Sequence, residues 1–166
     1  MAEAMRKEHT KSKILVLGVG NSILRDEGLG VHLARRLMEE ELPPQVEVHD
    51  GGTQGLELLG YLEDVTGLII VDCIMAGTEP GTIFRFEPDE VEVFPKQYKL
   101  SFHDLGIYDF LQVAAALDML PPTVIVGMEP AEVTWGENLS PAVEARMDVL
   151  KEVVLKEIER LTTAFH

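Results

Sequence analysis

The sequence is poor in cysteine and in long apolar runs. Cys73 is the single cysteine, so no disulfide can form within the chain, and this usage suits a reducing compartment such as the cytoplasm. No apolar run approaches the roughly 20 residues that a membrane-spanning helix needs, so we expect no contact with a membrane. No segment has the composition of an internal repeat, a low-complexity tract or a linker between domains.

Basic residues are also scarce. The chain has 14 Lys and Arg against 29 Asp and Glu, which gives a formal net charge of -15. This charge repels a phosphate backbone, and no segment gathers Lys and Arg into a basic stripe, so binding of nucleic acid is not expected. The acidity steers basic partners toward the surface, although a well-solvated protein is the plainer interpretation.

The chain of 166 residues is long enough for one domain. A domain of this size buries about two-thirds of the surface that its unfolded chain exposes. We therefore expect residues 1–166 to form a single domain with one core. Residues 1–11 carry no recognisable pattern, and we expect them to form a flexible N-terminal extension.

Strand and helix patterns alternate in the first half of the chain. Residues 14–19 form a compact apolar run typical of a strand, and residues 28–40 then repeat apolar side chains at helical spacing. A short strand is predicted over residues 46–49, a helix over 56–62 and a fully apolar strand over 68–71.

The second half continues the alternation. Residues 82–86 alternate like a half-buried strand, while residues 90–100 are interrupted by Pro95 and predict an edge excursion or a lid. Residues 104–117 return to helical spacing, and residues 123–126 form another apolar strand.

The final helix has the clearest pattern. Ser140 is the predicted N-cap, Pro141 occupies the first helical position, and Glu144 lies near the positive end of the helix. Its apolar stripe consists of Val143, Met147, Leu150, Val154, Ile158 and Leu161.

This order of elements predicts the α/β class. Strands that alternate with helices imply right-handed crossovers and a mostly parallel, twisted sheet with helices on both faces. Residues 82–94 are expected to add a small antiparallel edge. The prediction is a three-layer α/β/α sandwich.

The glycines that follow the first strand invite comparison with the dinucleotide-binding fingerprint. After Gly18 and Gly20, however, the third glycine position is occupied by Ile23. Asp26 and Glu27 also bring negative charge to the place where a pyrophosphate would lie. A tight turn and close packing of helix on strand explain the glycines sufficiently.

Three residues able to bind a metal, Glu27, Asp72 and His103, each stand where a predicted strand or its following loop gives way to a helix. The loops at the carboxyl ends of the strands of an open α/β sheet meet in one crevice, so residues far apart in sequence can converge there. Two carboxylates and one imidazole suit nickel, iron or zinc, and three protein ligands leave positions open for a substrate.

Each of the three also has a structural interpretation. Glu27 alone is better explained as a charge near a helix N-terminus, worth about 0.3–1 kcal/mol, and His103 alone as a hydrogen-bonding partner of Ser101 or the backbone. Asp72 ends a strand that should be buried on both faces, so it needs a cation or a hydrogen-bonded turn. Cys73 is expected to be a packing residue, because the Asp72 charge raises its pKa. The other histidines are interpreted as surface or structural residues: His9, His32, His49 and His166.

The segment Asp50-Gly51-Gly52-Thr53-Gln54-Gly55 has two interpretations. As structure, it is a flexible turn in which Asp50 accepts backbone hydrogen bonds. As a functional element, its bare backbone pairs with an extended peptide, since glycine permits close approach. The spacing does not decide between them.

The string Ile-Leu-Val-Leu-Gly-Val-Gly-Asn-Ser-Ile-Leu-Arg-Asp-Glu-Gly-Leu-Gly-Val at 14–31 resembles the opening of the hydrogenase maturation endopeptidases, which process the large subunit of nickel-iron hydrogenases. The similarity runs along nearly the whole chain, and its occurrence in this order is highly specific. The further strings are Asp50-Gly51-Gly52-Thr53, Ile70-Val71-Asp72, Pro80-Gly81-Thr82, Ser101-Phe102-His103 with Leu105-Gly106, and Leu139-Ser140-Pro141-Ala142-Val143-Glu144.

The resemblance implies roles for seven residues and does not identify a catalytic residue beyond the metal-contacting ones. Glu27, Asp72 and His103 fall on the family's three metal-contacting positions. The loop associated with recognising the precursor corresponds to Asp50, Gly51, Gly52 and Thr53.

The resemblance also implies an activity. The family removes a short C-terminal extension from the large-subunit precursor after nickel insertion. The metal is attributed to the substrate, so the isolated enzyme need not hold nickel as a cofactor. We expect a monomer with one transient partner, the precursor.

Two other functions remain open at this point. A noncatalytic nickel-sensing chaperone or precursor-binding module could use the same ligands without cutting a peptide bond. A dinucleotide-dependent oxidoreductase is the remaining alternative, against which the missing third glycine argues.

Overall fold

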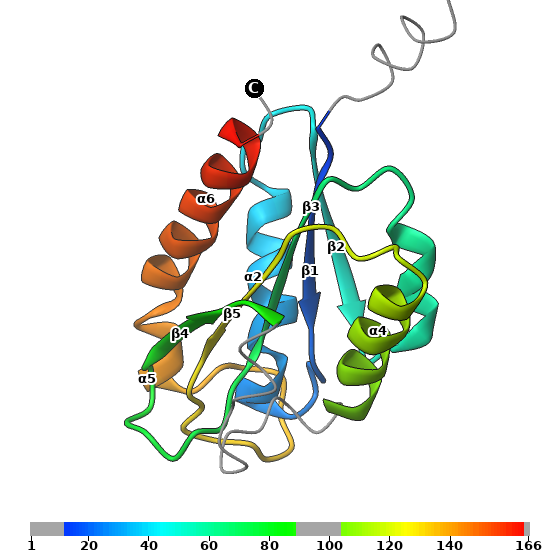
Figure 1. Ribbon diagram of the computed structural model, residues 1–166. Coiled ribbons are helices and arrows are strands. Elements are labelled where there is room, and N and C mark those ends of the chain that lie inside the picture. Colours follow the sequence, from blue (N-terminus) through cyan, green and yellow to red (C-terminus); the bar gives the residue numbers. More distant parts are fainter. Residues whose placement is uncertain (1–11, 89–103, 165–166) are drawn as a thin grey trace, which may run out of the picture.

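The computed structural model describes residues 12–88 and 104–164. They contain one sheet of five strands in the order β2-β1-β3-β5-β4, with helices on both faces (Figure 1). The strands are β1 (Ile14–Val19), β2 (Val46–Gly52), β3 (Gly67–Cys73), β4 (Ile83–Phe86) and β5 (Thr123–Met128). The helices are the 3₁₀ helices η1 (Arg25–Gly28) and η2 (Leu56–Tyr61), and the α-helices α2 (Leu29–Met38), α4 (Asp104–Ala116), α5 (Pro141–Glu144) and α6 (Met147–Thr163).

The sheet is mostly parallel. β1 pairs in parallel with β2 and β3, and β3 pairs in parallel with β5. β4 is antiparallel to β5 and forms one edge. The predicted three-layer α/β/α sandwich with a small antiparallel edge is therefore confirmed.

The core has two halves, one on each face of the sheet. Alternate residues of β3 point to opposite faces, as the pleat of a strand requires. Ile69 and Val71 belong to the half that α2 and α6 cover, whereas Leu68 and Ile70 belong to the half that η2 and α4 cover. By the same alternation, Asp72 lies on the α4 face.

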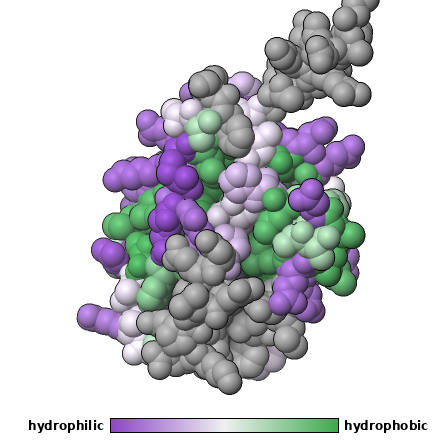
Figure 2. Space-filling view, viewed as in Figure 1, coloured by the Kyte–Doolittle hydropathy of each residue, from purple (hydrophilic) through white to green (hydrophobic). Residues whose placement is uncertain are grey.

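Surface polarity differs between two of the covering helices. In Figure 2 hydrophilic side chains project over α6 at the left, while apolar residues gather over α4 at the right. Within residues 12–88 and 104–164, no helix is both long and apolar enough to cross a membrane.

Several element boundaries differ from the prediction. β2 extends to Gly52, because the chain stays paired with β1 through a register shift near Gly51, so part of the expected turn is strand. The helix expected over 56–62 is a 3₁₀ helix. The final helix is divided into α5 and α6, and the Ser140 hydroxyl accepts a hydrogen bond from Val143 N at 3.4 Å, as expected of an N-cap. The segment 90–100 lies outside the described residues.

The first turn of α2 packs unusually close to the sheet. A Cβ on Gly18 would lie 2.1 Å from the Gly30 carbonyl oxygen, and a Cβ on Gly30 would lie 2.2 Å from the Val71 carbonyl oxygen. Neither backbone can move away without separating the helix from β1 and β3. The structural interpretation of Gly18 is thus confirmed, and η1 is held over the carboxyl ends of these strands.

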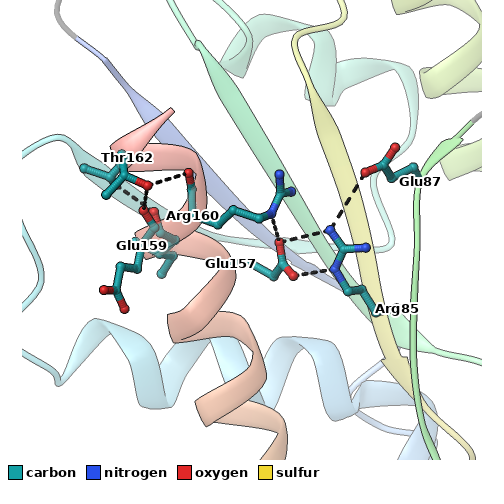
Figure 3. A network of polar contacts seen from close by, with 8 residues as sticks. Arg85, Glu87, Glu157, Glu159, Arg160 and Thr162 are labelled. Atoms are coloured by element: carbon teal, nitrogen blue, oxygen red, sulfur yellow. Dashed lines mark hydrogen bonds and ion pairs between the residues drawn. The ribbon is translucent and has the colours of Figure 1, made fainter. Parts of the chain in front are cut away.

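A buried carboxylate ties α6 to the edge strand β4 (Figure 3). Glu157 is 7% exposed and accepts hydrogen bonds from the guanidinium groups of Arg85 on β4 and Arg160 on α6. Burial raises the pKa of Glu157, but the hydrogen bonds from Arg85 and Arg160 outweigh it and leave the pKa below its ordinary value.

Replacing Glu157 with Gln should destabilise the fold by about 1.5–3 kcal/mol at pH 7, because both guanidinium groups lose a charged acceptor. A lowered pKa stabilises the native state above the ordinary Glu pKa of about 4.3 and loses that effect as pH falls through the native value. Urea unfolding of the variant and the wild type should therefore converge at acid pH.

The matched control is Glu152→Gln, an exposed position on the same helix. Its free energy of unfolding should stay within about 0.5 kcal/mol of the wild type. Indistinguishable unfolding of Glu157→Gln and wild type at pH 7 would contradict a stabilising role of the ion pairs.

Candidate functional site

The chain changes direction at the carboxyl ends of β1 and β3. After β1 it turns through η1 and α2 toward β2, whereas β3 lies on the other side of β1 and pairs with β5. In open α/β sheets, the crevice at such a switch point is the usual ligand site.

Glu27 and Asp72 lie together at this point. Glu27 is in η1, Asp72 is the penultimate residue of β3, and η1 is in contact with β3. Both side chains are 0% exposed. The structure therefore brings two of the three predicted metal-contacting residues to one buried place.

The carboxylate of Asp72 is engaged by its own turn. Its Oδ1 accepts a hydrogen bond from Cys73 N at 2.8 Å. The expectation that Asp72 needs a partner is met in part by this turn. An ionised carboxylate has further lone pairs with which it can bind a cation.

The pKa of the Cys73 thiol is raised by its surroundings at the site. Burial raises the pKa of its thiol well above the ordinary value, and the nearby charges of Asp72, Glu27, Asp26 and Glu129 raise it further. The thiol thus stays protonated near neutral pH and is not a nucleophile. Four acidic residues thus lie near one buried thiol.

His103 lies outside the described residues. Within residues 12–88 and 104–164, no cluster of three His, Cys, Asp or Glu side chains is arranged to hold a metal ion. The described part of the chain thus supplies two members of the predicted set, and the place of His103 stays a prediction.

Asp26, which the sequence analysis used only as a negative charge, has a structural role. Its Oδ2 accepts hydrogen bonds from Ala131 N at 2.9 Å, Glu132 N at 2.8 Å and Ser140 Oγ at 2.7 Å, and its Oδ1 accepts one from Ser140 N at 2.7 Å. The side chain is 0% exposed. Asp26 therefore fastens η1, and with it Glu27, to the loop that follows β5.

Glu129 does the same for the turn that follows Asp72. This residue is 4% exposed, and its carboxylate accepts hydrogen bonds from Ala76 N at 2.9 Å and Thr78 N at 2.6 Å. Asp26 and Glu129, with their hydrogen bonds to these loops, are called the two carboxylate clamps, and the sequence did not predict either of them. An acidic residue directly after an apolar strand is the only signal that could have suggested Glu129.

The turn into η1 depends on Gly20. Its φ is +130°, a conformation that favours glycine, and a Cβ there would lie 2.1 Å from the Glu27 carbonyl oxygen. The glycine therefore serves the close approach of two backbone segments. No phosphate is needed to explain it.

The predicted substrate loop lies at the end of β2, beside the end of β1. Asp50 Oδ1 accepts a hydrogen bond from Gly52 N at 2.9 Å, and Oδ2 pairs with Arg35 Nη2 at 3.2 Å. The expected backbone hydrogen bond of Asp50 is confirmed. Gly52 has a φ of +51°, Gly51 is buried and Thr53 is exposed. The recognition role stays a prediction.

The two described histidines outside the site have structural surroundings. The His49 ring lies 4.5 Å from the Tyr61 ring, and its Nε2 is 3.4 Å from Glu47 Oε2. His32 is half-buried on α2, and burial lowers its pKa. Their interpretation as surface or structural residues agrees with this. His9 and His166 lie outside the described residues.

The comparisons with known proteins agree on one family. The family model described as hydrogenase maturation protease matches residues 31–157. The chain is 38% identical over 146 residues to the hydrogenase 2 maturation protease of Escherichia coli, covering 86% of this chain and 88% of that protein. It is 36% identical over 149 residues to the hydrogenase expression/formation protein HupD of Rhodobacter capsulatus, covering 88% and 71%.

Solved structures give the same result. The hydrogenase maturating endopeptidase HybD from Escherichia coli is similar with a TM-score of 0.81 at 38% identity, covering 89% of this chain and 93% of that chain. The [NiFe] hydrogenase maturation protease HybD from Thermococcus kodakarensis is similar with a TM-score of 0.75 at 26% identity, covering 87% and 97%.

A match over most of the chain, on this α/β/α fold, defines the class of the protein. The chain belongs to the hydrogenase maturation protease family. It is accordingly an endopeptidase, a hydrolase of peptide bonds. Membership in this family excludes the two alternative functions, a dinucleotide-dependent oxidoreductase and a noncatalytic chaperone.

Replacing Asp26 with Asn should lower the free energy of unfolding by about 1.5–3 kcal/mol, because an amide cannot satisfy all four donors that the carboxylate accepts from. Urea denaturation measures the change. Asp109→Asn, an exposed carboxylate on α4, is the control and should shift stability by less than about 0.5 kcal/mol. Equal stability of the two variants would show that the clamp is energetically unimportant.

Proposed function

We propose that this endopeptidase removes the C-terminal extension of a nickel-iron hydrogenase large-subunit precursor after nickel has been inserted. In this proposal Glu27, Asp72 and His103 contact the nickel that the precursor carries. The observation that supports it most directly is the burial of two carboxylates together at the switch point between β1 and β3.

The electrostatics of that place suit a cation. Two carboxylates in a low-dielectric environment favour a positive charge between them, because burial weakens solvation and strengthens the Coulomb interaction. Burial is the main cause of the raised pKa of Cys73, and the charges of Asp72 and Glu27 raise that pKa further. Carboxylate oxygens with an imidazole nitrogen form a borderline donor set, which nickel accepts.

The nickel belongs to the substrate in this proposal. Three protein ligands leave coordination positions for groups of the precursor, so the metal joins the two proteins at one point. Only a loaded precursor then places its C-terminal segment correctly, and processing depends on metal insertion. In this proposal the two carboxylates bind the metal of the precursor and thereby orient the precursor on the enzyme.

The end of β2 suits the extended segment of the precursor. β2 is an edge strand of the described sheet, and Asp50, Gly51, Gly52 and Thr53 lie at its carboxyl end, on the same rim as Glu27 and Asp72. Gly51 is buried and Gly52 half-buried, whereas Thr53 is exposed, so a peptide would reach this loop from the Thr53 side. We assign these four residues to substrate binding, in a monomeric enzyme.

Gating by nickel can be tested with purified protein and two precursor samples, one loaded with nickel and one free of it. Mass spectrometry should show loss of the C-terminal peptide only from the loaded sample. The precursor must be shown to be equally folded in both samples. Cleavage of both samples at the same rate would refute metal gating.

The metal-contacting roles predict a common defect in three variants. Glu27→Gln, Asp72→Asn and His103→Ala should each slow processing at least about 10–100-fold, because each removes one contact to the metal. The two isosteric amides keep the size of the side chain, and Asp72→Asn keeps an acceptor for Cys73 N.

The control is again Glu152→Gln, which should process the precursor at the wild-type rate. Circular dichroism and urea unfolding establish that each variant is folded. A folded variant of any of the three residues with normal processing would remove that residue from the proposed site.

A further inference from the structure

Two large apolar side chains are exposed beside the candidate site. Trp135, on the loop after β5, is 75% exposed, and Ile23, on the loop after β1, is 46% exposed. Trp135 is the only tryptophan of the chain. Exposure of a tryptophan side chain to water is energetically unfavourable, and tryptophans contribute much of the binding energy of many protein interfaces.

Backbone pairing joins the two loops that carry Ile23 and Trp135. Leu24 and Gly136 form a parallel bridge, in which Arg25 N donates to Gly136 O at 2.9 Å and Gly136 N donates to Ile23 O at 2.9 Å. The bridge joins the residues that directly follow Ile23 and Trp135, so the two loops that carry these side chains adjoin. Together, Ile23 and Trp135 form the rim patch.

The loop that carries Trp135 is anchored by hydrogen bonds on both sides of this residue. The Asp26 carboxylate accepts hydrogen bonds from Ala131 N and Glu132 N on the one side and from Ser140 on the other side of Trp135. Because the loop is ordered before any partner binds, little conformational entropy is lost on binding. This is the condition under which an exposed aromatic residue becomes an effective anchor.

The position of the patch indicates what it contacts. Ile23 and Glu27 belong to the same short segment between β1 and α2, so a protein that contacts Glu27 does so only four residues along the chain from Ile23. Arg25 and Glu132 form an ion pair of 3.8 Å next to it, which supplies a polar margin of the kind that surrounds an interface core. A net charge of -15 disfavours an acidic lipid surface as the occupant.

We propose that Ile23 and Trp135 form the docking surface for the folded large-subunit precursor, with Trp135 inserted into an apolar pocket of that protein. This inference rests on the proposed function, since it names a contact made by the same substrate. It assigns affinity for the precursor to the rim patch and leaves the chemistry to the buried site.

Steady-state processing of nickel-loaded precursor tests the assignment. Trp135→Ala should raise KM at least 10-fold and leave kcat within 2-fold, because the contact is made equally in the ground state and the transition state. The control is Met38→Ala at the carboxyl end of α2, the opposite end of the sheet, where the side chain is 49% exposed. That variant should retain the wild-type KM and kcat.

A direct measurement uses the single tryptophan. Full-length protein labelled with 5-fluorotryptophan has one fluorine resonance, whose shift differs between H₂O and D₂O while Trp135 is exposed. Addition of unlabelled nickel-loaded precursor should abolish this solvent isotope effect. Circular dichroism of Trp135→Ala should match that of the wild type, since an exposed side chain contributes little to the core.

The outcomes separate the inference from the function on which it rests. If the wild type processes the precursor while the isotope effect persists and Trp135→Ala has a normal KM, the docking surface is refuted and the proposed function stands. If the isotope effect disappears when the protein alone is concentrated, the patch joins two copies of this chain and the assignment is wrong. If the wild type neither binds nor processes the precursor, both proposals are wrong.

Discussion

The close packing of α2 on the sheet is the constraint on which the site depends. Because residues 18 and 30 lack side chains, the first turn of the helix lies directly on the carboxyl ends of β1 and β3. The 3₁₀ turn that precedes the helix is thereby pressed against β3, and Glu27 comes to the same depth as Asp72. A methyl group at residue 18 or 30 would push the helix off the sheet and move Glu27 away from the end of β3. The two glycines therefore determine the geometry of the candidate site.

Buried carboxylates serve two different purposes at this rim. Asp26 and Glu129 are surrounded by backbone N–H groups and a hydroxyl, which neutralise their charge and hold the loops after β1, β3 and β5 in place. Glu27 and Asp72 lie between these clamps, at the point that we assign to the metal of the substrate. Four carboxylates can lie in one region of this acidic protein because backbone N–H groups donate hydrogen bonds to at least three of them, Asp26, Asp72 and Glu129.

The same clamps connect chemistry with recognition. Asp26 is the chain neighbour of Glu27, and its side chain binds the loop that carries Trp135, so this one residue connects the buried site to the exposed rim patch. Because of this connection, energy from binding the surface of a large protein substrate can be used to orient a small part of that substrate at the buried site. Figure 1 shows that these loops all gather at one end of the sheet, away from the C-terminus of α6.

The sequence by itself determined the α/β/α class, because strand and helix periodicity is local and a parallel sheet leaves few arrangements for it. It also placed Glu27 and Asp72 at one rim, since the carboxyl ends of parallel strands must lie on the same side. Tertiary structure alone decided that Asp26 binds the loop after β5, that Glu129 binds the turn after β3, and that β2 runs on through Gly52. Hydrogen bonds between distant loops follow no sequence period, so their partners are decided only when the packed elements bring those loops together.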